Sequence, residues 1–179
     1  LFGFENFCKD SFYYYFKSKT EIFEVAINYY LDEIMDHILS ILNNKEERTE
    51  IRFEKAINFM FRKATAKRQV GFKDIHLRRF REIHDKIVSR FNALLFPALK
   101  NLIIEGCESG VFKVEYPEEC SEMILHTIAG LCHNVEFYTS GEKRIRVSEF
   151  VKDLLNQTLN IEDHKLNIYV SMENIDEKF

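Results

Sequence analysis

Residues 18–44, SKTEIFEVAINYYLDEIMDHILSILNN, decide the fold class of this chain. Ser18 is followed three residues later by Glu21, and this spacing of a hydroxyl and an acid is typical of a capping box at the start of a helix. Apolar side chains then recur at spacings of one, three or four residues as far as Leu42. That period places them on one face of an α-helix, so the stretch predicts a single long amphipathic helix.

The same periodicity continues through most of the chain, interrupted by few glycines and only two prolines. Pro97 falls inside one stripe and predicts a kink, because proline removes a backbone donor. Pro117 precedes two acids and suits the first turn of another helix, which we expect to stop near Gly141. Strand signals are almost absent, so we predict an all-α helix bundle. After the first helix, the predicted helices cover about residues 48–67, 83–106, 117–141 and 147–159.

Composition excludes several classes of protein. The net charge of −4 is not that of a DNA-coating protein, so any contact with nucleic acid must come from a local patch. The four cysteines lie far apart without a C-x-x-C spacing, which favours neither a zinc site nor a disulfide framework and points to a reducing cytoplasm. No apolar run approaches the length that spans a bilayer, so no membrane partner is expected.

The segment from Ser11 to Lys19, SFYYYFKSK, concentrates hydroxyl groups, three tyrosines and two lysines. Hydroxyl and phenol groups can donate hydrogen bonds to phosphate oxygens, and lysines neutralise phosphate charge. Judged by residue types alone, the favoured interpretation is an aromatic margin of a core flanked by solvated lysines, because tyrosine is common at such margins.

The order of these residues resembles the end of the helix-turn-helix of TetR-family transcriptional regulators. There, a hydroxyl residue, an apolar residue, an aromatic triplet, Phe and Lys lead into the next long helix, as Ser11, Phe12, residues 13–15, Phe16 and Lys19 do here. Residues 94–99, 104–112 and 116–119 extend the resemblance into the second half. It implies a partial DNA-binding domain at 1–19 and a helical ligand-binding and dimerisation domain at 20–161. The remaining residues, 162–179, carry more acids than bases and have weak helical periodicity, so we expect an acidic tail that is a short helix or frayed.

The resemblance also implies roles for individual residues and a partner, double-stranded operator DNA. Phe12 and Phe16 would pack the small DNA-binding domain. Lys19, at the start of the long helix, would contact a phosphate, and the amides beside it would add the dipole of a helix N-terminus. The residues expected to face the operator are Ser11, Tyr13, Tyr14 and Tyr15.

One departure from the family concerns the N-terminal region. The family has about three helices before the long helix, whereas only seventeen residues precede Ser18 here. Residues 1–10 read like fragments of those helices with intervening residues removed. We therefore expect that the sequence lacks residues from this region; an intact mass near 21.4 kDa would contradict this expectation.

The resemblance further implies an apolar cavity for a small-molecule effector among the middle helices. A buried polar group needs a partner, which a ligand can supply, so polar residues within apolar stripes are the candidates. Phe, Met and Leu at the same spacing belong more often to a core than to a pocket. The candidate ligand-binding residues are Asn58, Asn92, His126, His133 and Asn134.

The last two long helices have wide apolar stripes, and Gly130 would permit a close approach. By resemblance they would pair with those of a second subunit, although such stripes can also close the core of a monomer. We thus expect a homodimeric, ligand-responsive repressor. The alternative is a helical interaction or small-molecule-binding module with a truncated DNA-binding end. No phosphate loop, G-x-S-x-G, H-E-x-x-H or metal-ligand spacing is present, so neither catalysis nor a cofactor nor a metal is expected.

Overall fold

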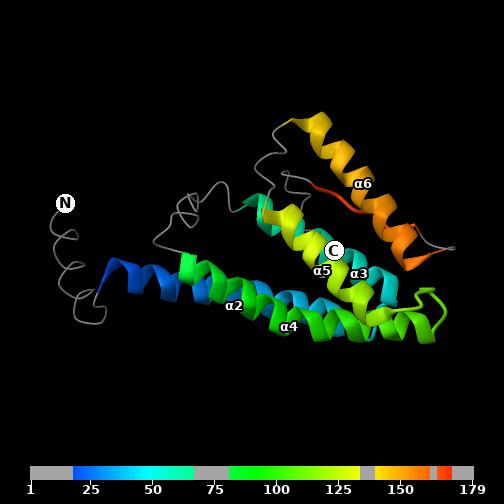
Figure 1. Ribbon diagram of the computed structural model, residues 1–179, viewed down its shortest axis with the longest axis horizontal. Helices are drawn as coiled ribbons and strands as arrows, with labels where there is room; N and C mark the ends of the chain where they lie inside the picture. The colour runs from blue at the N-terminus through cyan, green and yellow to red at the C-terminus, as the bar shows by residue number, and fades with distance from the viewer. Residues whose placement is uncertain (1–17, 67–80, 134–139, 162–164, 171–179) are drawn as a thin grey trace. The chain divides into compact units, whose positions relative to one another are not determined.

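The computed structural model describes residues 18–66, 81–133, 140–161 and 165–170 (Figure 1). All regular structure in these ranges is α-helical, which confirms the predicted all-α class. Residues 1–17, which hold most of the residues predicted to contact DNA, lie outside these ranges. The helices are α2 (Lys19–Asn43), α3 (Thr49–Ala66), α4 (Arg81–Glu108), α5 (Pro117–His133) and α6 (Gly141–Leu159).

Local capping explains where three of these helices begin. The backbone N–H of Glu21 donates to Ser18 Oγ at 3.1 Å, as expected for a capping hydroxyl, and α5 begins at Pro117 as predicted. The helix predicted to stop near Gly141 is α5, which is described as far as His133, and Gly141 itself is the first residue of the next helix, α6. Ser140 is the N-cap there, and its Oγ accepts the N–H of Lys143 at 3.2 Å. The capping hydroxyl thus outweighs the weak helix preference of glycine.

The chain divides into two compact units, Leu1–Ile34 and Met35–Phe179. In the first unit the structure describes Ser18 and the first part of α2, where Ile27, Leu31 and Ile34 are buried. The second unit contains the end of α2 and helices α3 to α6. The predicted domain boundaries at residues 19 and 161 stay predictions.

Helices α3, α4 and α5 pack on one another and form the core of the second unit. Phe53 of α3 and Phe112, which follows α4, meet edge to face with ring centroids 6.0 Å apart. Gly106 of α4 is required for this contact, since a Cβ atom there would lie 2.1 Å from the Phe112 ring. The chain leaves α4 through Gly110, whose φ of 75° favours glycine. Other fully buried core residues are Phe61, Leu95, Leu102, Ile103, Ile124 and Ile128.

A buried arginine joins the end of α2 to α3 and α4. The side chain of Arg52 is 1% exposed, and its guanidinium donates to the Leu42 carbonyl at 2.9 Å, to Thr49 Oγ1 at 3.2 Å and to the Glu105 carboxylate. Lys45 forms a second ion pair with Glu105. The Leu42 carbonyl lies in the last turn of α2, where carbonyls lack partners within the helix. We call these five residues the Arg52 cluster.

Residues 165–170 correct a further expectation. The sequence 162–179 was expected to be a short helix or frayed chain, but residues 165–170 are non-helical and lie beside α6 (Figure 1, red). Leu166, Ile168 and Val170 are buried, whereas Lys165, Asn167 and Tyr169 are exposed. This alternation has the period of two that an extended chain gives to its side chains. The helical periodicity of residues 165–170 is weak because their apolar residues alternate with a period of two, and these apolar side chains are nevertheless packed.

Candidate functional site

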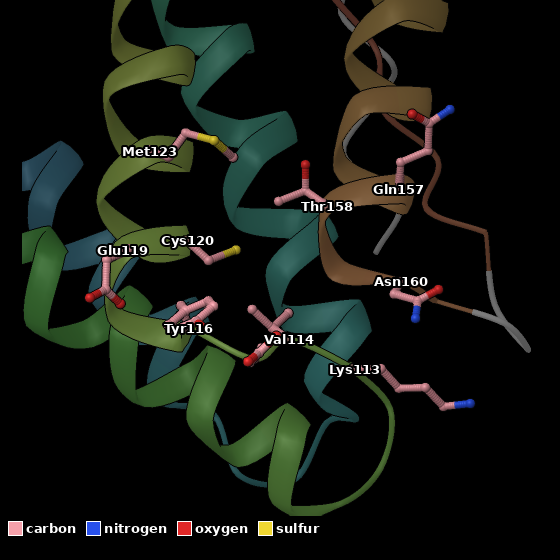
Figure 2. A pocket seen from close by; sticks show the side chains of 10 residues that line it. Lys113, Val114, Tyr116, Glu119, Cys120, Met123, Gln157, Thr158 and Asn160 are labelled. Carbon is pink, nitrogen blue, oxygen red and sulfur yellow. The ribbon is translucent and has the colours of Figure 1, made fainter.

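A surface groove of about 550 Å³ lies where the α4–α5 connector, the start of α5 and the end of α6 come together (Figure 2). The backbone N–H of Lys113 donates to the Leu159 carbonyl at 2.9 Å and so ties the connector to the end of α6. Asn160 ends α6 in the left-handed conformation, with φ 48°. The groove is lined by residues 113–116, Glu119, Cys120, Met123, Gln157, Thr158 and Asn160.

The groove is lined by a mixture of apolar and polar side chains. Val114, Tyr116, Cys120 and Met123 supply apolar surface, and Figure 2 shows Cys120 and Met123 of α5 on the side that faces Thr158 of α6. This composition suits a small ligand with an apolar body and a few hydrogen-bonding groups.

Cys120 does not provide a nucleophile at neutral pH. Burial of the thiol, with a smaller contribution from nearby Cys107, raises the pKa of Cys120 to about 11. The thiolate is the reactive and metal-binding form, so Cys120 behaves as a small apolar side chain here. The groove therefore fits binding better than covalent chemistry.

The residues predicted to contact DNA lie mostly outside the described part of the chain. Ser11, Tyr13, Tyr14 and Tyr15 all precede residue 18. Lys19 is the first residue of α2, and the structure describes its backbone. The prediction that these residues contact DNA stays a prediction.

The residues predicted to bind a ligand are dispersed along the chain, and the four that fall within the described ranges do not line the groove. Asn92 is half-buried on α4. His126 is exposed on α5, and its Nε2 lies 4.0 Å from a carboxylate oxygen of Glu122. His133 is the last residue of α5, and Asn134 lies outside the described residues.

The fifth candidate, Asn58, has a protein partner. Its Nδ2 donates to the Asn167 carbonyl at 2.7 Å, and its Oδ1 accepts the N–H of Tyr169 at 2.8 Å. A polar group in an apolar stripe needs a partner, and for Asn58 residues 165–170 supply it. Alternation in Leu166, Ile168 and Val170 is the signal that would have identified this segment, and the sequence reasoning missed it.

The described residues contain no group of three His, Cys, Asp or Glu side chains arranged to hold a metal ion. None of the helices in the described ranges is both long and apolar enough to cross a membrane.

Comparisons with known proteins provide no family for this chain. No protein-family model matches the sequence. Searches of curated proteins and of solved structures found no match either.

Proposed function

We propose that this chain is a ligand-responsive DNA-binding regulator of the TetR type, acting in the cytoplasm as a repressor rather than as an enzyme. The observation that carries the proposal is the capped start of α2. The Ser18 Oγ accepts the N–H of Glu21 at 3.1 Å, so a helix of 25 residues begins directly after the hydroxyl- and tyrosine-rich segment that resembles the end of a DNA-reading motif. Lys19 stands at the positive end of this helix, where a phosphate is favoured.

Exposed apolar side chains on the last two helices support a homodimer. Met123 of α5 is 45% exposed, and Ile145 and Phe150 of α6 are 61% and 60% exposed. Gly130 of α5 is exposed, and the lack of a side chain at glycine lets a second backbone approach closely. A two-fold dimer would present two reading segments to a palindromic operator.

The surface groove supports an effector site in the second unit. A small amphiphilic molecule bound between the connector, α5 and α6 would contact a helix that the proposed dimer uses. Binding that changes the geometry of the dimer would alter the affinity for the operator. By linkage, DNA would weaken effector binding by the same factor.

The test measures binding of the full chain to duplex DNA selected from a randomised library. We expect a specific duplex to be enriched, and we expect Lys19→Ala to weaken its binding and to reduce the salt dependence by about one phosphate contact. The matched control is Lys143→Ala, which removes an exposed lysine near the start of α6. Fluorescence anisotropy at several salt concentrations gives both quantities, and light scattering checks that the oligomeric state is unchanged.

Two outcomes would overturn the proposal: enrichment of no duplex, or equal binding by the Lys19 and Lys143 variants. If the wild-type chain binds a small molecule but no DNA, the alternative is favoured, namely a helical interaction or small-molecule-binding module.

A further inference from the structure

We propose that α3 and α6 form a binding site for an extended peptide with apolar side chains at alternate positions, and that residues 165–170 are its resident ligand. We call this site the α3–α6 groove; its polar residues are Glu54 and Asn58 of α3 and Ser148 and Asn156 of α6. This inference does not depend on DNA binding.

The α3 side of the groove recognises the backbone of the odd-numbered residues. Glu54 Oε2 accepts the N–H of Asn167 at 2.8 Å. Asn58 then pairs with two backbone groups at once, the carbonyl of Asn167 at 2.7 Å and the N–H of Tyr169 at 2.8 Å. The Asn58 carboxamide thus bonds to the carbonyl of one residue and to the N–H of the residue two positions later, as a residue of a neighbouring strand does in a parallel β-sheet.

The α6 side recognises the backbone of even-numbered residues. Asn156 Oδ1 accepts the N–H of Leu166 at 2.9 Å, and Ser148 Oγ accepts the N–H of Val170 at 2.8 Å. Backbone groups of successive residues in an extended chain point to opposite sides, so odd residues bond to α3 and even residues to α6. The polar side chains of α3 therefore bind one edge of the extended segment, and those of α6 bind the opposite edge.

Apolar burial supplies the sequence preference. Leu166, Ile168 and Val170 are exposed by only 0%, 3% and 2%. On α6, residues Val151 and Leu155 are also buried. Because hydrogen bonds to the backbone are independent of side-chain identity, the polar contacts fix the extended conformation while the three alternating apolar side chains determine which peptides fit.

The groove binds its ligand through side chains that are mostly neutral, and this makes the ligand exchangeable. Three of the four polar residues are amides or hydroxyls, and the fourth, Glu54, is only half-buried, so removal of the segment would leave no fully buried charge behind. Ser148 and Asn156 also donate to carbonyls of α6 itself, of Arg144 and Lys152, so these two side chains keep partners within their own helix. A peptide supplied in trans with the same pattern would make the same contacts.

The first experiment measures binding of a labelled peptide with the sequence of residues 165–170, KLNIYV, capped at both ends. The receptor is the full chain carrying Ile168→Asp, which disfavours the resident segment. We expect saturable one-to-one binding, at least ten-fold tighter than to the wild-type chain, whose own segment competes. Adding Asn58→Leu to the receptor should weaken binding about ten-fold, because two hydrogen bonds are lost.

Two altered peptides act as matched controls. Replacing Asn167 by Ala in the peptide should leave binding unchanged, because the Asn167 side chain is exposed and only its backbone is bound. Replacing the amide of Tyr169 by an ester removes the N–H that Asn58 accepts and should weaken binding. Absence of binding to the folded Ile168→Asp chain, or binding that ignores the Asn58 substitution, overturns the proposal.

A second measurement keeps Ile168 in place and so does not depend on the folding of the Ile168→Asp variant. Amide hydrogen exchange of the full wild-type chain should show residues 166–170 exchanging at least ten-fold slower than in the free peptide, yet faster than the core amides of α3 and α5. Asn58→Ala should accelerate exchange in this segment without affecting the core. Exchange at the rate of the free peptide, or only together with the core, overturns the proposal.

Discussion

Two regions of the second unit use polar side chains to hold segments together, and they do so in different ways. The Arg52 cluster places a cation that is 1% exposed against the end of α2 and the carboxylate of Glu105. The α3–α6 groove uses mainly amide and hydroxyl groups against the backbone of residues 165–170. A buried charge that loses its partner is strongly destabilising, whereas the loss of one neutral hydrogen bond costs only about 1 kcal/mol. The Arg52 cluster is therefore expected to be a permanent anchor, and residues 165–170 are the contact that we propose to be exchangeable.

The largest effect is expected when the Arg52 cluster loses its cation. Arg52→Ala should lower the free energy of unfolding by about 3 kcal/mol, because it leaves Glu105 and the Leu42 carbonyl without this donor. The matched control is Lys45→Ala, which removes the other cation on Glu105 from a side chain that is 69% exposed. That change should cost less than about 1 kcal/mol. Urea unfolding followed by circular dichroism measures both, and equal losses would contradict the view of Arg52 as the anchor.

An intermediate effect is expected when residues 165–170 lose apolar contact. Ile168 is 3% exposed, so Ile168→Ala should cost about 2 kcal/mol through lost burial and a residual cavity. Asn167→Ala removes an exposed side chain from the neighbouring position and should stay within about 0.5 kcal/mol. Thermal unfolding combined with amide exchange reports the two changes. If Ile168→Ala lowered the free energy of unfolding as much as Arg52→Ala does, the two regions would not differ in the way proposed.

The smallest effect is a pH dependence confined to the Arg52 cluster. Burial disfavours the charged form of Glu105, but hydrogen bonds and charge from Lys45 and Arg52 outweigh this and lower its pKa below the usual 4.5. A carboxyl whose pKa is depressed in the folded state stabilises the fold above pH 4.5 and loses that contribution as the pH falls through the folded pKa. The stability difference between the wild type and Glu105→Gln should therefore shrink on acidification below pH 4.5. A difference that stays constant between pH 7 and pH 3 would contradict this assignment.

Much of the helical architecture was predictable because it depends on local rules. The apolar period of residues 18–44, the hydroxyl of Ser18 and the position of Pro117 each predicted a helix start or a buried face that the structure contains. The start of α6 at Gly141 was not predicted, although the capping bond of Ser140 that explains it is equally local.

The candidate site was less predictable, since its contacts join residues that are distant in sequence. Asn58 was singled out as a polar residue in an apolar stripe, but its partners lie 109 and 111 positions later. The surface groove combines residues 113–123 with residues 157–160, and no periodicity indicates that these segments meet.

By itself, the sequence determined that this chain forms amphipathic helices, because a period near 3.6 residues and capping hydroxyls act within one or two turns. Only the tertiary structure decided which polar side chains receive partners. Arg52 and Glu105 are 53 positions apart, and Glu54 and Asn167 are 113 positions apart, so their pairing requires that packed helices first bring them together. Burial then sets the energy of each pairing, and burial is a property of the assembled fold rather than of any local pattern.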